Sequence, residues 1–224
     1  YTPAGKSKVR GPHNIIRLIR TGATLERTGA MNVVLDAFEA PPALRFIAKA
    51  LGKPFQFLGY KGDPTMPPAT RALTALGPAY IKFGQILSTR PDVVGNELAE
   101  QLRVLQDKLP PFPVEVAKAE VQKELGQATD TIFLEFSESV AAASIAQVHK
   151  AKLAETGENV AIKVLRPGIE RAFTKDVDAF YLAARIIEIF APGARRLRPI
   201  EVIEHFDGVV QGELDLRLES SAAG

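Results

Sequence analysis

The chain has 224 residues, of which 46% are hydrophobic and 24% charged, and it contains no cysteine. This composition is typical of a globular protein and excludes collagen, coiled coil and wholesale disorder. The missing cysteines and only three histidines, far apart in sequence, argue against a metalloenzyme, and a formal net charge of +2 is too small to predict nucleic-acid binding. No apolar run is long enough to span a bilayer, and no signal peptide opens the chain, so we expect an intracellular or membrane-peripheral protein.

The first predicted element is a basic amphipathic helix over residues 11–28. Its isoleucines and leucines are expected near one face, and Arg17, Arg20 and Arg27 elsewhere. Two interpretations stay open. The helix could dock on the protein with a solvated basic face, or it could attach to an anionic membrane surface.

Apolar residues at helical spacing predict four further helices, at 31–51, 67–87, 95–108 and 114–125. Prolines and glycines between 54 and 68 indicate a loop of about fifteen residues. Pro78 predicts a kink or break in the third helix of the chain. Gly84, flanked by Lys82 and Gln85, indicates close approach of a partner element, although a plain surface Lys and Gln near a helix crossing is the alternative.

After Gly126 the hydrophobic period changes from helical to alternating. Strands are predicted at 131–137, 148–153 and 159–165, with a turn at Thr156 and Gly157. Two long helices follow, at 169–190 and 200–219. The expected fold class is therefore α+β, with a small antiparallel sheet between two sets of helices.

The alanine-rich segment before Val148 is the strongest candidate for a phosphate-binding loop. In the kinase pattern G-x-G-x-x-G-x-V, the glycine places here hold Ala141, Ala143 and Ala146. Alanine carries a Cβ, so the loop should be stiffer and stand further from phosphates than a glycine loop.

A second kinase signature lies on the following strand. Residues 160–163 read V-A-I-K, in which the lysine points at nucleotide phosphates. Either pattern alone is weak, but their order on neighbouring strands predicts a nucleotide-binding, kinase-like N-lobe.

Lys163 needs a carboxylate partner to stay oriented and charged. On the last predicted helix, Asp215 and Glu219 are four residues apart and share a face, as do Glu213 and Arg217. Lys163 is a candidate cation for this pair of acids. The alternative is a solvated acidic face with a Glu213–Arg217 pair.

The ordered motifs resemble those of one known family. They comprise L-G-P at 76–78, I-K-F-G-Q at 81–85, L-S-T-R-P-D at 87–92, L-Q-D at 105–107, P-P-F-P at 110–113, A-A-A-S-I-A-Q-V-H at 141–149, V-A-I-K-V at 160–164, R-P-G at 166–168 and E-L-D at 213–215, with Glu219. Together they resemble the signature region of the UbiB family of atypical kinase-like proteins, over most of the chain.

The resemblance implies ATP or ADP with Mg²⁺ as cofactors, ATPase or small-molecule kinase activity, and a role in ubiquinone biosynthesis at the cytoplasmic face of a bacterial inner membrane. It implies catalytic roles for Lys163 and its helix partner Glu219. It implies a polar cluster that disfavours protein phosphorylation, made by Lys82, Gln85, Glu213 and Asp215. Implied nucleotide contacts are Ala141, Ala142, Ala143, Ser144, Ile145, Ala146, Val148, Ala161 and Lys163. Possible partners are a membrane, a quinone-precursor lipid and the biosynthetic enzymes.

Three segments are expected: basic helices and a linker at 1–66, a helical extension at 67–126 and the N-lobe at 127–224. The catalytic Asp, Asn and D-F-G of phosphoryl transfer are missing, and His205–Gly208, which reads H-F-D-G, is interpreted as a decoy. We therefore expect no metal site and no phosphoryl transfer from these residues alone. A nucleotide-switched scaffold is the alternative function.

Overall fold

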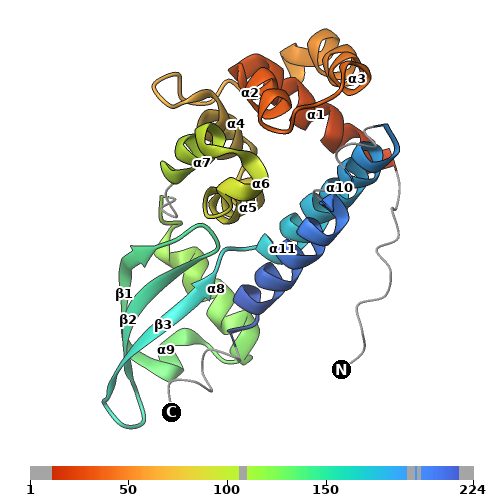
Figure 1. Cartoon of the computed structure of the whole chain (residues 1–224). Coiled ribbons are helices and arrows are strands. Elements are labelled where there is room, and N and C mark those ends of the chain that lie inside the picture. The colour runs from red at the N-terminus through yellow and green to blue at the C-terminus, as the bar shows by residue number, and fades with distance from the viewer. Residues whose placement is uncertain (1–11, 106–109, 191–194, 196–197, 217–224) are drawn as a thin grey trace. The chain divides into compact units, whose positions relative to one another are not determined.

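The computed structural model describes residues 12–105, 110–190, 195 and 198–216 (Figure 1). The chain forms two compact units, which are described separately. The helical unit comprises residues 1–106 and 172–224, and the sheet unit comprises residues 107–171. The helical unit is thus discontinuous in sequence.

The helical unit consists of helices, many of which begin with proline. Proline suits the first helical position because the N–H that it lacks would have no partner there. The elements are α1 (Pro12–Thr28), α2 (Ala30–Ala37), α3 (Pro42–Gly52), the 3₁₀ helix η1 (Lys53–Leu58), α4 (Pro68–Leu76), α5 (Pro78–Ser88), α6 (Pro91–Val94), α7 (Asn96–Arg103), α10 (Ile169–Phe190, of which residues 172 onward belong here) and α11 (Pro199–Leu214).

Two sequence predictions for the helices need correction, and one is confirmed. The helix predicted at 31–51 is two helices, since Pro41 and Pro42 separate α2 from α3. The predicted loop after residue 54 contains η1. The break expected at Pro78 is confirmed: Gly77 adopts φ 111° between α4 and α5, a conformation that L side chains rarely adopt.

Four aromatic rings form the centre of the helical unit. Tyr80 meets Phe180 edge-on at 4.7 Å between ring centroids, and Phe83 lies 5.1 Å from Phe180 and 5.2 Å from Phe206. These rings join α5 to α10 and α11, which run side by side in Figure 1. The core of this unit therefore needs residues from both of its sequence segments.

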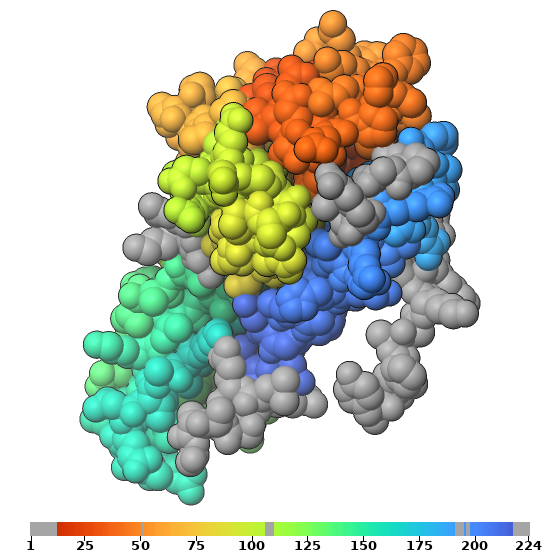
Figure 2. Space-filling model, in the orientation of Figure 1, coloured from red at the N-terminus to blue at the C-terminus, as the bar shows by residue number. Residues whose placement is uncertain are grey.

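The N-terminal helices pack on one another through glycines. A Cβ added at Gly59 would lie 2.5 Å from the carbonyl carbon and oxygen of Ala23 and 2.6 Å from the backbone nitrogen of Thr24. At Gly52 it would lie 3.0 Å from the carbonyl oxygen of Gly22. The space-filling view shows these red and orange segments in close contact (Figure 2). The backbone of α1 is thus approached closely at two points.

The three arginines of α1 differ in their surroundings, because Arg20 is exposed whereas Arg17 and Arg27 bond within the unit. Arg17 pairs with Asp176, and Arg27 donates to the carbonyls of Phe57 at 3.2 Å and of Gly59 at 2.8 Å. Meanwhile Ile15 and Ile16 are 56% and 60% exposed. Arg17 and Arg27 hold other elements against α1, and Arg20 leaves part of the predicted basic face exposed.

The sheet unit is an antiparallel sheet of order β1-β2-β3 with helices on one face. Its elements are α8 (Val114–Leu125), α9 (Thr129–Ile132), β1 (Phe133–Ala142), β2 (Ala146–Leu153) and β3 (Asn159–Leu165). Ala117 and Val121 of α8 pack with Phe133, Ala151 and Val164 of the sheet. The predicted α+β class and three-stranded meander are confirmed, but β1 extends to Ala142 and not to residue 137 as predicted.

Candidate nucleotide-binding face and the Lys82–Glu213 pair

The alanine-rich segment is a tight hairpin. Ala141 and Ala142 end β1, Ala146 begins β2, and only residues 143–145 lie between the strands. The N–H of Ala143 donates to the carbonyl of Ala146 at 2.8 Å. Much of the expected loop is therefore strand, and this N–H is engaged inside the turn.

Several predicted nucleotide contacts share one face of the sheet. Val148 lies opposite Ala141 on β1 and opposite Lys163 on β3. Residues directly opposite each other in an antiparallel pair project to the same face, as do residues two apart on one strand. Ala161 therefore lies on this face as well. We call the set Ala141, Val148, Ala161 and Lys163 the outer face, since α8 packs on the other side.

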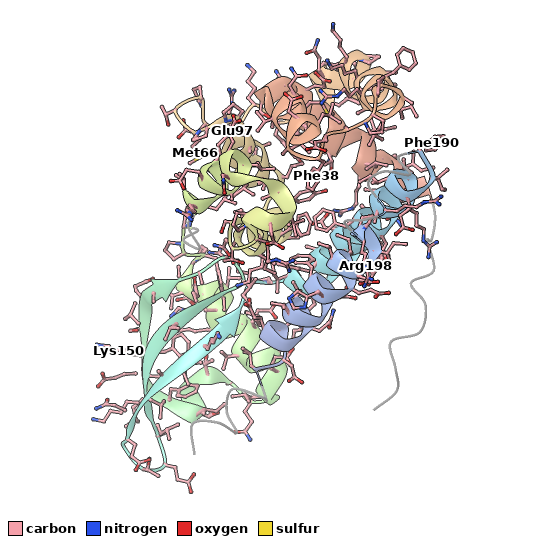
Figure 3. The ribbon with its side chains drawn as sticks, viewed as in Figure 1. Phe38, Met66, Glu97, Lys150, Phe190 and Arg198 are labelled. Atoms are coloured by element: carbon pink, nitrogen blue, oxygen red, sulfur yellow. The ribbon has the colours of Figure 1, made fainter. Side chains whose placement is uncertain are left out.

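Charge and exposure distinguish the outer face from the core face. Along β3, Ala161 and Lys163 are exposed, whereas Val164 is buried and Val160 and Ile162 pack on the core. Lys150, which pairs with Ala161, also lies on the outer face, and Figure 3 shows its side chain extending away from the sheet. The outer face thus combines small or apolar side chains with lysines, of which Lys163 lies nearer the hairpin turn than Lys150 does.

Arg166, just after β3, holds the hairpin turn through hydrogen bonds to a backbone carbonyl of the turn. Its Nε and one Nη donate to the carbonyl of Ala143 at 3.2 and 3.0 Å, and the same Nη donates to Pro110 at 2.9 Å. The backbone N–H of Arg166 donates to the Ile145 carbonyl at 2.9 Å. Burial lowers the pKa of the guanidinium. The turn is therefore fixed by a charged donor.

A buried polar network fixes the segment before α8. The side-chain amide of Gln147 accepts from the N–H of Phe112 at 3.0 Å and donates to its carbonyl at 3.2 Å. The same amide nitrogen lies 2.8 Å from Nε2 of His149, whose Nδ1 lies 2.8 Å from the carbonyl of Ser137. This geometry fits a His149 that donates through Nδ1 and accepts through Nε2.

In the helical unit, Lys82 of α5 forms an ion pair with Glu213 of α11. Its Nζ lies 2.6 Å from Oε1 of Glu213, and the two side chains are 16% and 35% exposed. Glu213 lies in the last turn of α11, where the helix dipole disfavours an acid, so a cation there is stabilising. Gln85 follows Lys82 by three residues on α5 and is partly buried.

Glycine in the middle of α5 allows the close approach that was predicted. A Cβ at Gly84 would contact Leu105 and would lie 2.5 Å from Cδ1 of Leu73 and 3.5 Å from Cδ2 of Leu102. The α5 backbone is thus brought near α4 and α7. This packing places Lys82 on the side of α5 that faces α11.

The predicted acidic helix face needs correction. The helix α11 ends at Leu214, and Asp215 has φ −87° and ψ 86°, which is not helical. Asp215 therefore lies outside α11, and Glu213 pairs with Lys82. Glu219 and Arg217 lie outside the described residues.

The other sequence expectations concern metals and membranes. Residues 205–208 lie inside α11, so H-F-D-G is a decoy as predicted. Within the described ranges, no group of three histidines or acids could hold a metal ion. No helix among these residues is long and apolar enough to cross a membrane.

Sequence reasoning did not single out three features of this site: the bracing role of Arg166, the Gln147–His149 network and Lys150. One signal was available. Polar residues at 147 and 149 alternate with Val148, so a strand would place both on the core face. A buried Gln and His there require partners.

Comparison with known proteins identifies the chain's family. The ABC1 atypical kinase-like domain matches residues 104–224. A "Probable protein kinase UbiB" from Marinobacter nauticus is 46% identical over 153 residues, which are 68% of this chain and 28% of that protein. The protein of that name from Pseudomonas paraeruginosa is 39% identical over 210 residues, 92% of this chain and 39% of that protein. No solved structure matches.

The chain belongs to the ABC1 atypical kinase-like family, and these curated relatives are proteobacterial proteins named UbiB. The predicted resemblance and the kinase-like N-lobe are thereby confirmed. The chain spans between about a quarter and two fifths of the length of the relatives that it matches.

Proposed function

We propose that this chain supplies the nucleotide-binding N-lobe and the helical extension of an atypical kinase-like protein that supports ubiquinone biosynthesis. The observation that most supports this proposal is the outer face, where strand pairing brings Ala141, Val148, Ala161 and Lys163 together. The relatives' printed name, probable protein kinase, agrees with nucleotide binding.

Each residue of the outer face has a distinct part in this proposal. The ammonium of Lys163 would offset the negative charge of the α- and β-phosphates, while Val148 and Ala161 would contact the base. The turn at 143–145, with Ala142 and Ala146 at its borders, would cover the phosphates. Arg166 keeps the turn in shape by binding its carbonyl, without touching the nucleotide.

A bound nucleotide would supply the phosphoryl group for hydrolysis or transfer. The described residues offer no carboxylate cluster for Mg²⁺, so we derive no step that uses a metal from them. Glu219 is the proposed helix partner of Lys163. Transfer to a small molecule, as opposed to a protein, remains our preferred activity for the complete protein.

Lys82 and Gln85 form the regulatory part of the proposal, together with Glu213 and Asp215. The Lys82–Glu213 pair at 2.6 Å ties α5 to the end of α11. In this arrangement α5 would be the element that disfavours protein substrates. The boundaries at 67–126 and 127–224 belong to this proposal too.

A nucleotide-switched scaffold is the second candidate. The stiff, internally bonded alanine turn favours it, because a turn whose N–H of Ala143 is engaged has one fewer donor for phosphates. In either case we propose that the protein acts at the cytoplasmic face of the inner membrane, with quinone-precursor lipids or biosynthetic enzymes as partners.

Nucleotide binding by the full-length protein tests the proposal. We expect Lys163→Ala to weaken ATP binding in the presence of Mg²⁺ by about tenfold or more, since a hydrogen bond to a charged group contributes about 1.5–3 kcal/mol. Ala143→Gly should shift the ATP-to-ADP preference by relaxing the turn. Lys150→Ala is the matched control, because it removes a lysine from the same face but farther from the hairpin turn. It should change the affinity for ATP less than threefold.

Equal losses from Lys163→Ala and Lys150→Ala would refute the assigned contact. An affinity that is insensitive to Lys163→Ala and to Ala143→Gly would leave the kinase-like fold without a nucleotide role. Steady ATP hydrolysis that Lys163→Ala abolishes would favour the enzyme over the scaffold.

A further inference from the structure

The helical unit contains an apolar cavity of about 300 Å³. Among the lining side chains in the described part of the chain, Thr21 and Tyr80 alone carry polar groups. Helices α1 to α7, α10 and α11 contribute to its wall, including Phe38, Phe83, Phe180, Leu73 and Ala183. Phe38, labelled in Figure 3, projects from the end of α2 into the unit. Close packing normally leaves no voids of this size, so the space is a candidate binding site.

A second pocket, of about 310 Å³, adjoins the first. The two share Thr21, Leu76 and Tyr80 as lining residues. The hydroxyls of Thr21 and Tyr80 lie 2.7 Å apart and form the polar boundary between them. Burial raises the pKa of Tyr80, in keeping with a boundary of low polarity.

The second pocket is cationic. Arg17, Arg20 and Lys175 line it against a single carboxylate, Asp176, which Arg17 already binds. Arg20 lies over the ring of Tyr60 at 5.8 Å and donates to its hydroxyl at 3.5 Å. Arg20 and Lys175 are exposed, so two cationic groups remain able to meet an anion.

We propose that the helical unit binds a single-chain anionic amphiphile, with its hydrocarbon chain in the apolar cavity and its head group against Arg20 and Lys175. A cavity of this size is about twice the volume of one that holds a benzene ring, which corresponds to a chain of roughly twelve carbons. A carboxylate or a phosphate head would satisfy the two cations equally well. The site consists of helical-unit residues alone and does not depend on nucleotide binding.

Calorimetry on the full-length protein, without nucleotide and below micelle-forming concentrations, tests the proposal. Dodecyl phosphate is expected to bind one to one, and at least tenfold more tightly than dodecyltrimethylammonium. From octyl to dodecyl phosphate, affinity should rise about fourfold per methylene as each is buried. Dodecanoate should bind like dodecyl phosphate.

Variants separate the two halves of the site. Arg20→Gln should weaken dodecyl phosphate binding at least fivefold, and Ala183→Phe, which fills the cavity, at least tenfold. Arg185→Gln changes an exposed arginine of α10 outside both pockets and should have no effect. If Ala183→Phe does not fold, the chain-length series reports on the cavity in its place.

Three results would overturn the proposal. Inorganic phosphate binding as tightly as dodecyl phosphate would indicate an anion site without a chain site. Equal binding of the ammonium amphiphile would remove the role of Arg20 and Lys175. Binding confined to phosphatidylglycerol vesicles and unchanged in Ala183→Phe would indicate adsorption to a membrane surface.

Discussion

The Lys82–Glu213 pair should be strongly coupled, and a double-mutant cycle measures this directly. The cycle combines Lys82→Met and Glu213→Gln, so that each single change removes the charge pair while keeping side-chain volume. At 2.6 Å and an effective dielectric constant of 20, the gross attraction is roughly 6 kcal/mol. Partial desolvation of both groups offsets much of this.

The exposure of the two side chains sets the expected remainder. Exposed pairs couple by about 0.2–1 kcal/mol, whereas close, desolvated pairs couple by about 1.5 kcal/mol or more. Lys82 is 16% exposed and Glu213 35%, so we expect a coupling free energy of about 1.5–2 kcal/mol in this pair. Urea unfolding of the four proteins gives the value.

The pair Arg198–Glu201, at the N-terminal end of α11, is the matched control. Its atoms are 3.1 Å apart, but its side chains are 71% and 61% exposed, so its coupling should stay below about 0.5 kcal/mol and fall further in 1 M salt. A Lys82–Glu213 coupling no larger than this control would show that the pair is a solvated surface contact. The assignment of Lys82 as the cation for α11 would then fail.

Further predictions concern packing, bracing and pH. Gly59→Ala should lower the free energy of unfolding by about 3 kcal/mol, because the added Cβ would meet α1 backbone atoms that cannot move aside. Gly208→Ala, with open space around it inside α11, should raise the free energy of unfolding by about 0.5–1 kcal/mol. Thermal unfolding that ranks the two variants the other way would contradict the packing argument. Arg166→Gln should reduce hydrogen-exchange protection at the hairpin turn by about 2 kcal/mol, and unchanged protection would mean that the turn holds itself. Burial raises the pKa of Asp176 despite the opposing effects of Arg17 and Lys175, so the protonated carboxyl stabilises the fold fully below pH 3.8, and this stabilisation is lost as the pH rises through the raised pKa. When the unfolding of Asp176→Asn is compared with that of the parent at pH 4 to 7, the variant should gain relative stability with pH. A relative loss would mean that the attraction of Arg17 outweighs the effect of burial on this pKa.

The sequence predicted the bounds of helices and strands correctly where proline or glycine marks their ends. The bounds of α8, β3 and α10 agree with the prediction, because proline or glycine lies at or near one or both ends of each. The end of α11 was missed by five residues, since neither glycine nor proline directly follows Leu214 to mark it. Helix bounds are thus predictable where the backbone chemistry itself changes.

Side-chain partners across long stretches of chain were beyond sequence reasoning. The motifs placed Val148, Ala161 and Lys163 on adjacent strands and Ala141 in the loop before them, and the observed register puts all four on one face. By contrast, Glu213 has Lys82 as its partner, and Arg17 has Asp176, across more than a hundred residues in each case. Periodicity identifies which face of a helix is apolar, but it does not show which distant element will contact a particular arginine.

The discontinuity of the helical unit bears on the order in which this protein can fold on the ribosome. The rings of Tyr80 and Phe83 have no packing partners until Phe180 and Phe206 are synthesised, which happens after the whole sheet unit. At roughly 5–20 residues per second, the delay between Phe83 and Phe206 is several seconds to some tens of seconds. During that time the nascent N-terminal helices expose apolar surface, so a slower rate of synthesis is expected to increase their need for chaperones.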